Sequence, residues 1–591
     1  QPPMYPPSQS MGGPEYSTSY SAGGQPQYGA VPVPPPPSSG QYQPQPSYSA
    51  SKSTGVDKTA LLADSSAAPA PTTGGGYRDV LWMVAFWLHA LVIVGLAGWG
   101  GKQLYDEIEH LEKESHSNSH HSTSTDVEPE TTVDVSGKEV LYILLFTAGM
   151  ATILSGLWVT FLIRCAKSFI IFTILFKVVI SVGMGIGLYI LTKQIALLII
   201  WCLAGCLGLL WYCCVRKRLA FAGANVEVGA GAVGLYPATL FTAFGALLAS
   251  FVWVALWSTA VAGIFVTIIN KDMAQQGDSQ SRLLAGTTSD DPGHDNNGGT
   301  PEDVDPSSGA AAKFTLLTFV MLISFYWGVQ VCRNVLHTTI AGTVGTWWRQ
   351  ARPESPTYGA LCRAMTTSFG TIALGSLIIA IIQALKAMVR NARRNSQGGA
   401  RVALACLQCC IGCIERLAEY FTSYAFVMAA LYGTTFYQSA SRVMSLFRDR
   451  GFTTIINDVI VDRALGLGVL LVALANAGLG VAFGMAFGKE GTDAREVGMV
   501  IGGVLGFIFG LGLCSIVTSV IHSAVQTVYV CWAEAPEALA DTHPEEFGKL
   551  LTAWMEAFPS VMQKAGYDRF TAPGGAVPVA APVGPVGKGG V

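Results

Sequence analysis

The sequence predicts an all-α, polytopic membrane protein with about ten transmembrane helices. Half of the 591 residues are hydrophobic, and 13% are charged, compared with roughly 25% in soluble domains. The mean hydropathy is +0.41. Uncharged segments of about 20 residues, the length that crosses about 30 Å of hydrocarbon, recur along the chain. The formal net charge of −3 gives no basis for nucleic acid as a partner.

Residues 1–79 differ in composition from the rest of the chain. They are rich in Pro, Gln, Ser, Tyr and Gly, and residues 34–37 are all proline. Such a segment cannot bury enough apolar area to offset the entropy of ordering it, so we predict a disordered cytoplasmic tail. It lacks a charged stretch followed by an apolar one, so we expect no cleaved signal peptide and insertion directed by the first membrane helix.

Ten spans are predicted within a transmembrane domain at 80–533. They are 80–99, 140–163, 169–191, 195–215, 235–269, 314–336, 364–384, 403–436, 464–488 and 497–533. The fifth exceeds one crossing by about ten residues and is expected to tilt or to project beyond the bilayer. The remaining C-terminal tail, 534–591, is amphipathic at first, with apolar residues Phe547, Leu550, Leu551, Trp554 and Phe558.

Charge in the loops predicts the orientation. Two acidic segments, 102–138 and 270–313, are predicted to be outer loops, the second of them flexible. Lys and Arg in short loops favour the cytoplasm, and the basic clusters near residues 164, 217, 350 and 446 all fall on one side if both termini are cytoplasmic. Residues 386–401 are also basic, but simple alternation of the predicted spans places this loop on the outer, non-cytoplasmic side. Either spans seven and eight are partly re-entrant or interfacial, or the rule fails here.

Motifs typical of enzymes carry little weight. The run Gly229–Gly234 matches G-x-G-x-x-G, but no βαβ unit surrounds it, so we interpret it as a flexible linker. Histidines in the first outer loop either bind metal or sense pH, or they are incidental in a solvated loop. Walker A, H-E-x-x-H and G-x-S-x-G patterns are absent from the sequence. We therefore predict neither an enzyme nor a bound cofactor or metal.

Four cysteines, Cys406, Cys409, Cys410 and Cys413, follow the spacing i, i+3, i+4, i+7. This is one face of a helix, and four thiolates along a straight face extend too far to close a zinc tetrahedron. We expect a packed or lipidated stripe. No cysteine lies in either predicted outer loop, so an external disulfide framework is not expected.

Two further features lie inside the predicted spans. Glycines repeat every fourth residue at 480–488 and at 502–510, which allows helix backbones to pack closely. Lys177 is alone in the middle of span three. An intramembrane charge faces a cavity or a partner, so Lys177 either snorkels, forms a structural ion pair or contacts a substrate.

The most promising set of residues for ligand binding lies in span eight. Glu415 and Glu419 are one helical turn apart, and Tyr420 and Tyr424 repeat that offset one residue later, so acidic and aromatic groups adjoin. A quaternary ammonium has no N–H to donate, and its recognition relies on aromatic faces and nearby negative charge. We predict an aromatic cage around the cation. Besides Tyr420 and Tyr424, its candidate members are Tyr432, Tyr326, Trp327 and Trp158. The alternative is that the tyrosines are interface anchors and the glutamates pair with Arg416 or another basic residue.

A stretch at 325–348 joins an apolar segment to Asn334, His337 and a small-residue run that ends in Trp347 and Trp348. A membrane helix is expected to end here against protein. With Tyr358–Thr366 and the string Leu417–Gly433, this stretch resembles the choline transporter-like family, solute carrier family 44. The Pro/Gln-rich start and His543–Pro544 resemble its fungal branch, the pH-nine-sensitive proteins. The resemblance covers roughly residues 80–560.

The resemblance implies about ten membrane helices, cytoplasmic termini, a large outer loop after helix one and association with choline or related cations. The first outer loop here is short and lacks cysteines and N-x-S/T sequons, unlike many animal members. We expect a plasma-membrane facilitator or secondary carrier for choline-like cations, with its site between spans that include two, six and eight. A membrane scaffold or stress-response protein whose tails recruit protein partners, or a channel, is the alternative.

Overall fold

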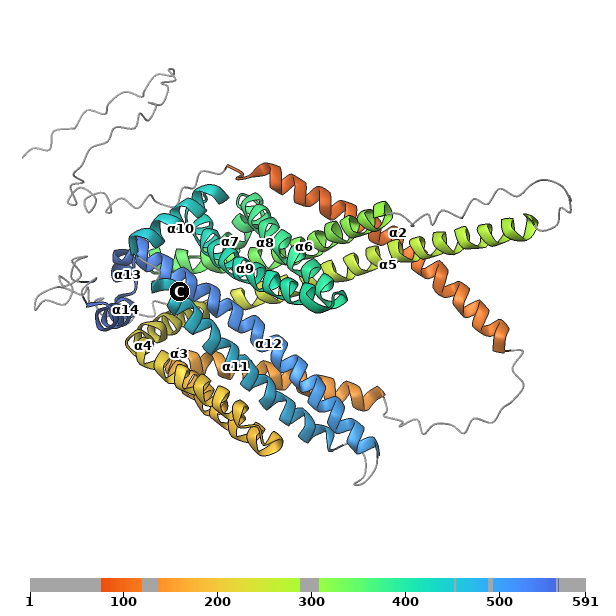
Figure 1. Cartoon of the computed structure of the whole chain (residues 1–591). Helices are drawn as coiled ribbons and strands as arrows, with labels where there is room; N and C mark the ends of the chain where they lie inside the picture. The colour runs from red at the N-terminus through yellow and green to blue at the C-terminus, as the bar shows by residue number, and fades with distance from the viewer. Residues whose placement is uncertain are drawn as a thin grey trace, which may run out of the picture. The chain divides into compact units, whose positions relative to one another are not determined.

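The computed structural model describes residues 76–119, 137–286, 308–450, 453–486, 493–559 and 562, and this part of the chain is helical without strands (Figure 1). It confirms the predicted all-α membrane fold. The helices are α2 (Val80–Ser119), α3 (Gly137–Thr192), α4 (Ile195–Gly234), α5 (Ala238–Gly286), α6 (Ser308–Arg349), α7 (Pro356–Met365), α8 (Phe369–Asn395), α9 (Gly398–Tyr432), α10 (Phe436–Arg450), α11 (Thr453–Gly484), α12 (Asp493–Glu534), α13 (Pro536–Thr542) and α14 (Pro544–Ala557).

Eight helical segments of the described chain are long and apolar enough to cross a membrane. One of them, within α3, runs for 55 residues, and the helix leaves helical geometry at Cys165. This break separates the predicted second and third spans, so α3 has the length of two crossings. The predicted eighth span corresponds to α9, which is not among these eight segments. Nine helices of the described chain thus correspond to the ten predicted spans, with α3 covering two of them.

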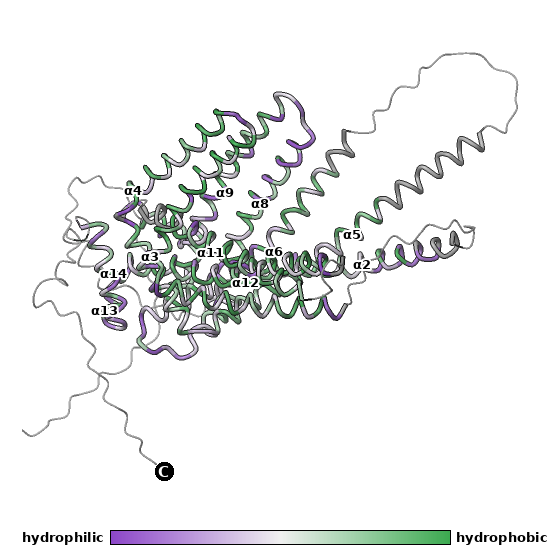
Figure 2. Tube along the Cα trace, turned by 90° about the horizontal axis from the view of Figure 1, so that it is seen from below, coloured by the Kyte–Doolittle hydropathy of each residue, from purple (hydrophilic) through white to green (hydrophobic). Residues whose placement is uncertain are grey.

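The outer surface of these segments suits lipid. Large apolar side chains such as Leu145, Leu203, Phe241 and Leu248 are exposed, and apolar residues run along α3, α4, α5 and α6 (Figure 2). In water such a surface would be costly. In a bilayer, the helices satisfy their backbone groups internally and the apolar side chains face hydrocarbon.

Helix ends meet at one side of the bundle. The backbone N–H of Arg78 donates to the carbonyl of Thr367, 2.9 Å away, and its Nε donates to the carbonyl of Gly433 at 3.0 Å. A carboxylate oxygen of Asp79 accepts from the backbone N–H of Phe436 at 2.8 Å. We call this the terminal side, because α2 begins and α6, α9 and α12 end there, and we call the opposite side the loop side. Arg78 and Asp79, at the end of the predicted tail 1–79, therefore contact the bundle, and residues 1–75 lie outside the described residues.

The glycine repeats pack as predicted. Backbone atoms of Gly480 and Gly484 in α11 lie against those of Gly502 and Gly498 in α12. Closer to the terminal side, the Asn476 amide donates to the carbonyls of Gly506 at 2.7 Å and Thr147 at 3.1 Å. This buried amide ties α3, α11 and α12 together, so these three helices form one side of the bundle.

Several predicted boundaries differ from the structure. The predicted outer loops are helical in part, because α2 continues to Ser119 and α5 to Gly286; residues 120–136 and 287–307 lie outside the described residues. The predicted seventh span begins too early: α7 ends at Met365, and a break precedes α8. The linker interpretation of Gly229–Gly234 is wrong. This run is the last part of α4, and Gly229 packs against Ala524 and Val525 of α12.

The amphipathic part of the C-terminal tail docks on the terminal side. Helix α14 buries Phe547, Leu550 and Leu551. The ring of Trp554 meets Phe221 of α4 edge to face, with centroids 4.5 Å apart. On the other flank, the indole of Trp348 donates to the carbonyl of Ala535 at 2.8 Å. The tail thus holds the ends of α4, α6 and α12 together.

Candidate functional site

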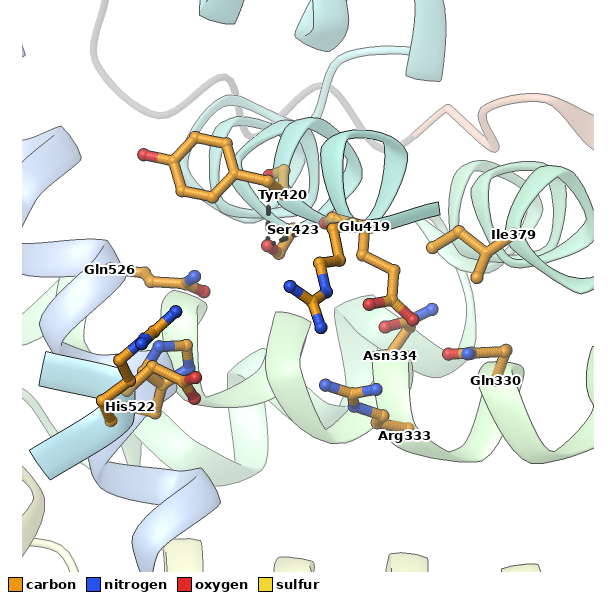
Figure 3. Close-up of a pocket in the computed structure, with 12 residues that line it drawn as sticks. Gln330, Arg333, Asn334, Ile379, Glu419, Tyr420, Ser423, His522 and Gln526 are labelled. Carbon is orange, nitrogen blue, oxygen red and sulfur yellow. Dashed lines mark hydrogen bonds between the residues drawn. The ribbon is translucent and has the colours of Figure 1, made fainter. Parts of the chain in front are cut away.

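A cavity of about 460 Å³ lies between α6, α8, α9, α11 and α12 (Figure 3). The α6 residues that line it lie roughly midway along the apolar segment of this helix, which runs from Phe314 to Arg349. The lining residues are Gln330, Arg333, Asn334, Ile379, Arg416, Glu419, Tyr420, Ser423, Asp462, Arg463, His522 and Gln526. Polar side chains at this depth in a membrane protein are costly unless they face water, a partner or a ligand. The cavity is therefore the candidate functional site.

One wall of the cavity is a chain of amide hydrogen bonds. Gln330 of α6 donates to Gln383 of α8 at 3.1 Å, and Gln383 donates onward to the Glu419 carboxylate of α9 at 3.2 Å. Beside them, Asn334 donates to the Ser376 hydroxyl at 2.9 Å. These bonds fix the spacing of three helices and orient the half-buried carboxylate of Glu419 toward the cavity.

A buried histidine ties the opposite helices together behind the lining. His337 of α6 lies 3.0 Å from the carbonyl of Ser423 through Nε2, and its Nδ1 lies 2.8 Å from the hydroxyl of Ser523. A carbonyl oxygen only accepts, so Nε2 carries the hydrogen of that bond. His337 thus links α6 to both α9 and α12 and positions the helices that carry the lining residues.

The structure places two of the eight predicted binding residues, Glu419 and Tyr420, on the cavity wall. Tyr420 is the one Phe, Tyr or Trp residue in the lining. The ring of Tyr424 packs against it, with centroids 4.8 Å apart, but Tyr424 is itself 1% exposed. Tyr424 therefore supports the wall from behind rather than facing the space.

The remaining predicted aromatic residues do not converge on the cavity. The indole of Trp327 donates to the carbonyl of Ala373 at 2.9 Å and stacks on His89, and Tyr326 packs at the edge of the same cluster. Trp158 lies on α3, where its indole donates to Thr518 at 3.3 Å. These indole N–H groups have partners within the protein, so their rings are held as packing elements away from the cavity.

Glu415 and Tyr432 have other charged partners. Glu415 is buried and forms an ion pair with Lys386 of α8, so one of the two predicted glutamates follows the structural alternative. Tyr432, at the terminal end of α9, donates to Glu534 of α12 at 3.0 Å and accepts from Arg349 of α6 at 3.1 Å. This cluster joins the terminal ends of three of the five helices that line the cavity.

The charged members of the lining were largely missed by the sequence reasoning. Arg333, Arg416, Asp462 and Arg463 have exposed side chains and line the cavity, so it is open rather than sealed. Asp462 and Arg463 lie close to the start of an apolar segment, where charges ordinarily flank a span. The signal available in the sequence was Arg333, a charge well inside an apolar stretch.

Other predicted features lie away from this cavity. Lys177 of α3 is exposed and is not in the lining, although it is close enough to Arg463 for their charges to repel. All four cysteines of the α9 stripe are exposed, so the stripe is not packed inside the protein. Within the described residues, no group of three or more His, Cys, Asp or Glu side chains is arranged to hold a metal ion.

The fold and the cavity define a polytopic helical membrane protein with a polar site among its spans, as membrane transport requires. Comparison with known proteins gives the family. The model of the family described as "Plasma-membrane choline transporter" matches residues 199–537, more than half of the chain. The chain therefore belongs to the choline transporter-like family.

The curated relatives identify the branch. The chain is 26% identical over 439 residues to Protein PNS1 of Eremothecium gossypii, covering 72% of this chain and 73% of the relative. It is 27% identical over 443 residues to Protein PNS1 of Saccharomyces cerevisiae, covering 72% and 75%. A CTL-like protein of Dictyostelium discoideum is 25% identical over 409 residues, covering 68% and 64%. The chain belongs with the fungal PNS1 branch.

Proposed function

We propose that this protein carries choline or a related organic cation across the plasma membrane, as a facilitator or secondary carrier, and that the cation binds in the cavity. The observation that carries the proposal is the position of Glu419. Its carboxylate faces an open space midway along the helices, held there by Gln383. The family match supports a cation as the cargo.

Glu419 and Tyr420 supply complementary parts of a cation site. A quaternary ammonium is attracted by a nearby carboxylate and by the face of an aromatic ring, worth about 0.5–2 kcal/mol per ring. Tyr424 packs on Tyr420 and limits the orientations of that ring. A cavity of about 460 Å³ falls within the roughly 300–1,000 Å³ typical of small-molecule sites.

Alternating access needs one side of the cavity to close, and the terminal side has the contacts to do so. Tyr432 links α6, α9 and α12 there, and α14 packs against the end of α4. We take the terminal side as cytoplasmic because the basic short loops lie on it. Cations would then enter from the loop side, where the acidic segments raise their local concentration over a Debye length of about 8 Å.

Uptake of labelled choline into cells with and without the protein tests the proposal. Glu419→Gln keeps the shape of the side chain and removes its charge, so uptake at low choline should fall roughly 10-fold or more. Glu415→Gln is the matched control, since it makes the same change one turn away on a carboxylate that faces Lys386. Uptake is normalised to surface protein.

A second pair of variants tests the ring. Tyr420→Ala should weaken uptake much more than Tyr420→Phe if the aromatic face binds the cation, whereas equal losses would implicate the hydroxyl. Unchanged choline uptake at every pH in cells that display the protein at their surface would remove choline from the proposal.

A further inference from the structure

The charges that line the cavity do not match a ligand that is only a cation. Three guanidinium groups, those of Arg333, Arg416 and Arg463, face two carboxylates, those of Glu419 and Asp462. Lys177 is close enough to Arg463 to repel it. With ordinary charges, the lining carries a net charge of +1. A choline molecule in this cavity would be attracted by Glu419 and repelled by the arginines around it.

Among the described residues, no close hydrogen bond or ion pair neutralises the three arginines, although Arg333 is near enough to Glu419 for their charges to attract. Across the described ranges, none of the three guanidinium groups forms a hydrogen bond or an ion pair. Glu419 accepts from an uncharged amide, that of Gln383. Figure 3 shows Arg333 on α6 and Glu419 on α9 directed toward one another across the open space. Arginines inside a membrane protein ordinarily pair with an anion, a carbonyl or water, and these three are exposed in the open cavity, where a ligand anion can reach them.

A second anionic group on the ligand would supply the missing partner. The guanidinium fork binds phosphate and carboxylate through two parallel N–H···O bonds. Three such groups arise from three different helices, so an anion between them would draw α6, α9 and α11 together. The polar side chains of Asn334 on α6 and Gln526 on α12 also line the cavity.

We propose that the ligand of this cavity is a small zwitterion. A quaternary or protonated ammonium binds at Glu419 and Tyr420, and a phosphate or carboxylate on the same molecule binds at Arg333, Arg416 and Arg463. This inference rests on the proposed function for its cationic half and adds the anionic half. It applies to a soluble zwitterion and to the headgroup of a zwitterionic lipid alike.

The test compares three probes that share a trimethylammonium group: choline, which has no anion, glycine betaine, which has a carboxylate, and phosphocholine, which has a phosphate. Binding is measured on the purified full-length protein in phosphatidylglycerol nanodiscs by titration calorimetry. We expect betaine or phosphocholine to bind at least about 10-fold more tightly than choline, the effect of one charge-assisted hydrogen bond.

Charge-neutralising variants assign the anion to the arginines. Arg333→Gln and Arg416→Gln should each weaken phosphocholine binding about 10-fold and strengthen choline binding, since each removes a charge that repels choline. Arg394→Gln is the control, because it changes an exposed arginine at the end of α8 outside the cavity lining. Melting temperatures of the variants check that they fold. Repeating the titration in phosphatidylcholine nanodiscs separates the sources: competition by the bilayer indicates the lipid headgroup, and its absence indicates a soluble zwitterion.

Three results overturn the inference in distinguishable ways. If choline binds as tightly as both zwitterions and the arginine variants change nothing, the zwitterion is excluded and the proposed cation carrier stands. If inorganic phosphate competes as well as phosphocholine, the ammonium contributes nothing and the proposed function fails with the inference. If none of the three probes binds to folded protein, both fail.

Discussion

Tyr432→Phe removes the hydroxyl group through which Tyr432 holds helix ends together at the terminal side. The hydroxyl donates to Glu534 at 3.0 Å and accepts from Arg349 at 3.1 Å. The ring stays, so the contacts of the Arg349 and Arg442 guanidinium groups with its face, at 5.1 Å and 4.5 Å from the centroid, are kept. Tyr432→Phe therefore weakens the hydrogen bonding without changing the packing.

The expected size follows from these bonds. A hydrogen bond to a charged group contributes about 1.5–3 kcal/mol. Arg349 and Glu534 still attract one another in the variant, so we count one such bond as the net loss. Because about 1.4 kcal/mol is a factor of ten, the population with the terminal side open should rise roughly 10- to 100-fold.

Cys531 reports that opening. It is 2% exposed and lies one turn before Glu534 on α12. Its alkylation by N-ethylmaleimide, followed by mass spectrometry, should accelerate by the same factor in Tyr432→Phe. The exposed Cys206 and Cys409 are internal references whose rates should not change.

Tyr437→Phe is the matched control, since Tyr437 is 82% exposed on α10 and its loss should leave Cys531 protected. An unchanged rate at Cys531 in folded Tyr432→Phe would refute the reasoning, because the hydroxyl would then contribute nothing to closure.

Two further predictions concern packing and pH. Gly480→Ala places a methyl group against the backbone of Gly502, so the purified protein should lose about 1–3 kcal/mol of stability and melt at a lower temperature; Gly478→Ala, which meets open space, should not. Burial lowers the pKa of His543 from its ordinary 6.5, and Glu546 opposes this in part. The unfolded segment then binds the proton more readily, so docking is most stable above pH 6.5 and weakens as pH falls through the lower folded pKa. Hydrogen exchange of α14, corrected for intrinsic rate, should rise over that range, and His543→Gln should abolish the pH dependence.

Although the sequence did not determine where several of the helices end, it determined the membrane fold and which segments form its long helices. This follows because crossing hydrocarbon requires an uncharged segment of about 20 residues, and composition along the chain records that requirement directly. The glycine repeats behaved similarly: backbone contact between α11 and α12 needs small residues at fixed spacing, and Gly480 and Gly502 meet as expected.

Local composition gave wrong predictions of where some helices end. Gly229–Gly234 has the residues of a flexible linker, but it continues α4 because α12 packs against it. Tertiary contact offsets the entropic cost of ordering glycine in a helix. The polar start of the predicted outer loops is likewise helical up to Ser119 and Gly286.

The candidate site was decided by the tertiary structure. Glu415 and Glu419 are equivalent in the sequence, one turn apart on the same helix, yet Lys386 pairs with the first while the second faces the cavity. Whether a charged or aromatic side chain meets a partner or a cavity depends on which helices are its neighbours. The chain's local pattern specifies where each helix runs and which face is apolar, but the neighbours are set only when the bundle assembles, so Arg333, Arg416 and Arg463 could be recognised as one group only in the folded protein.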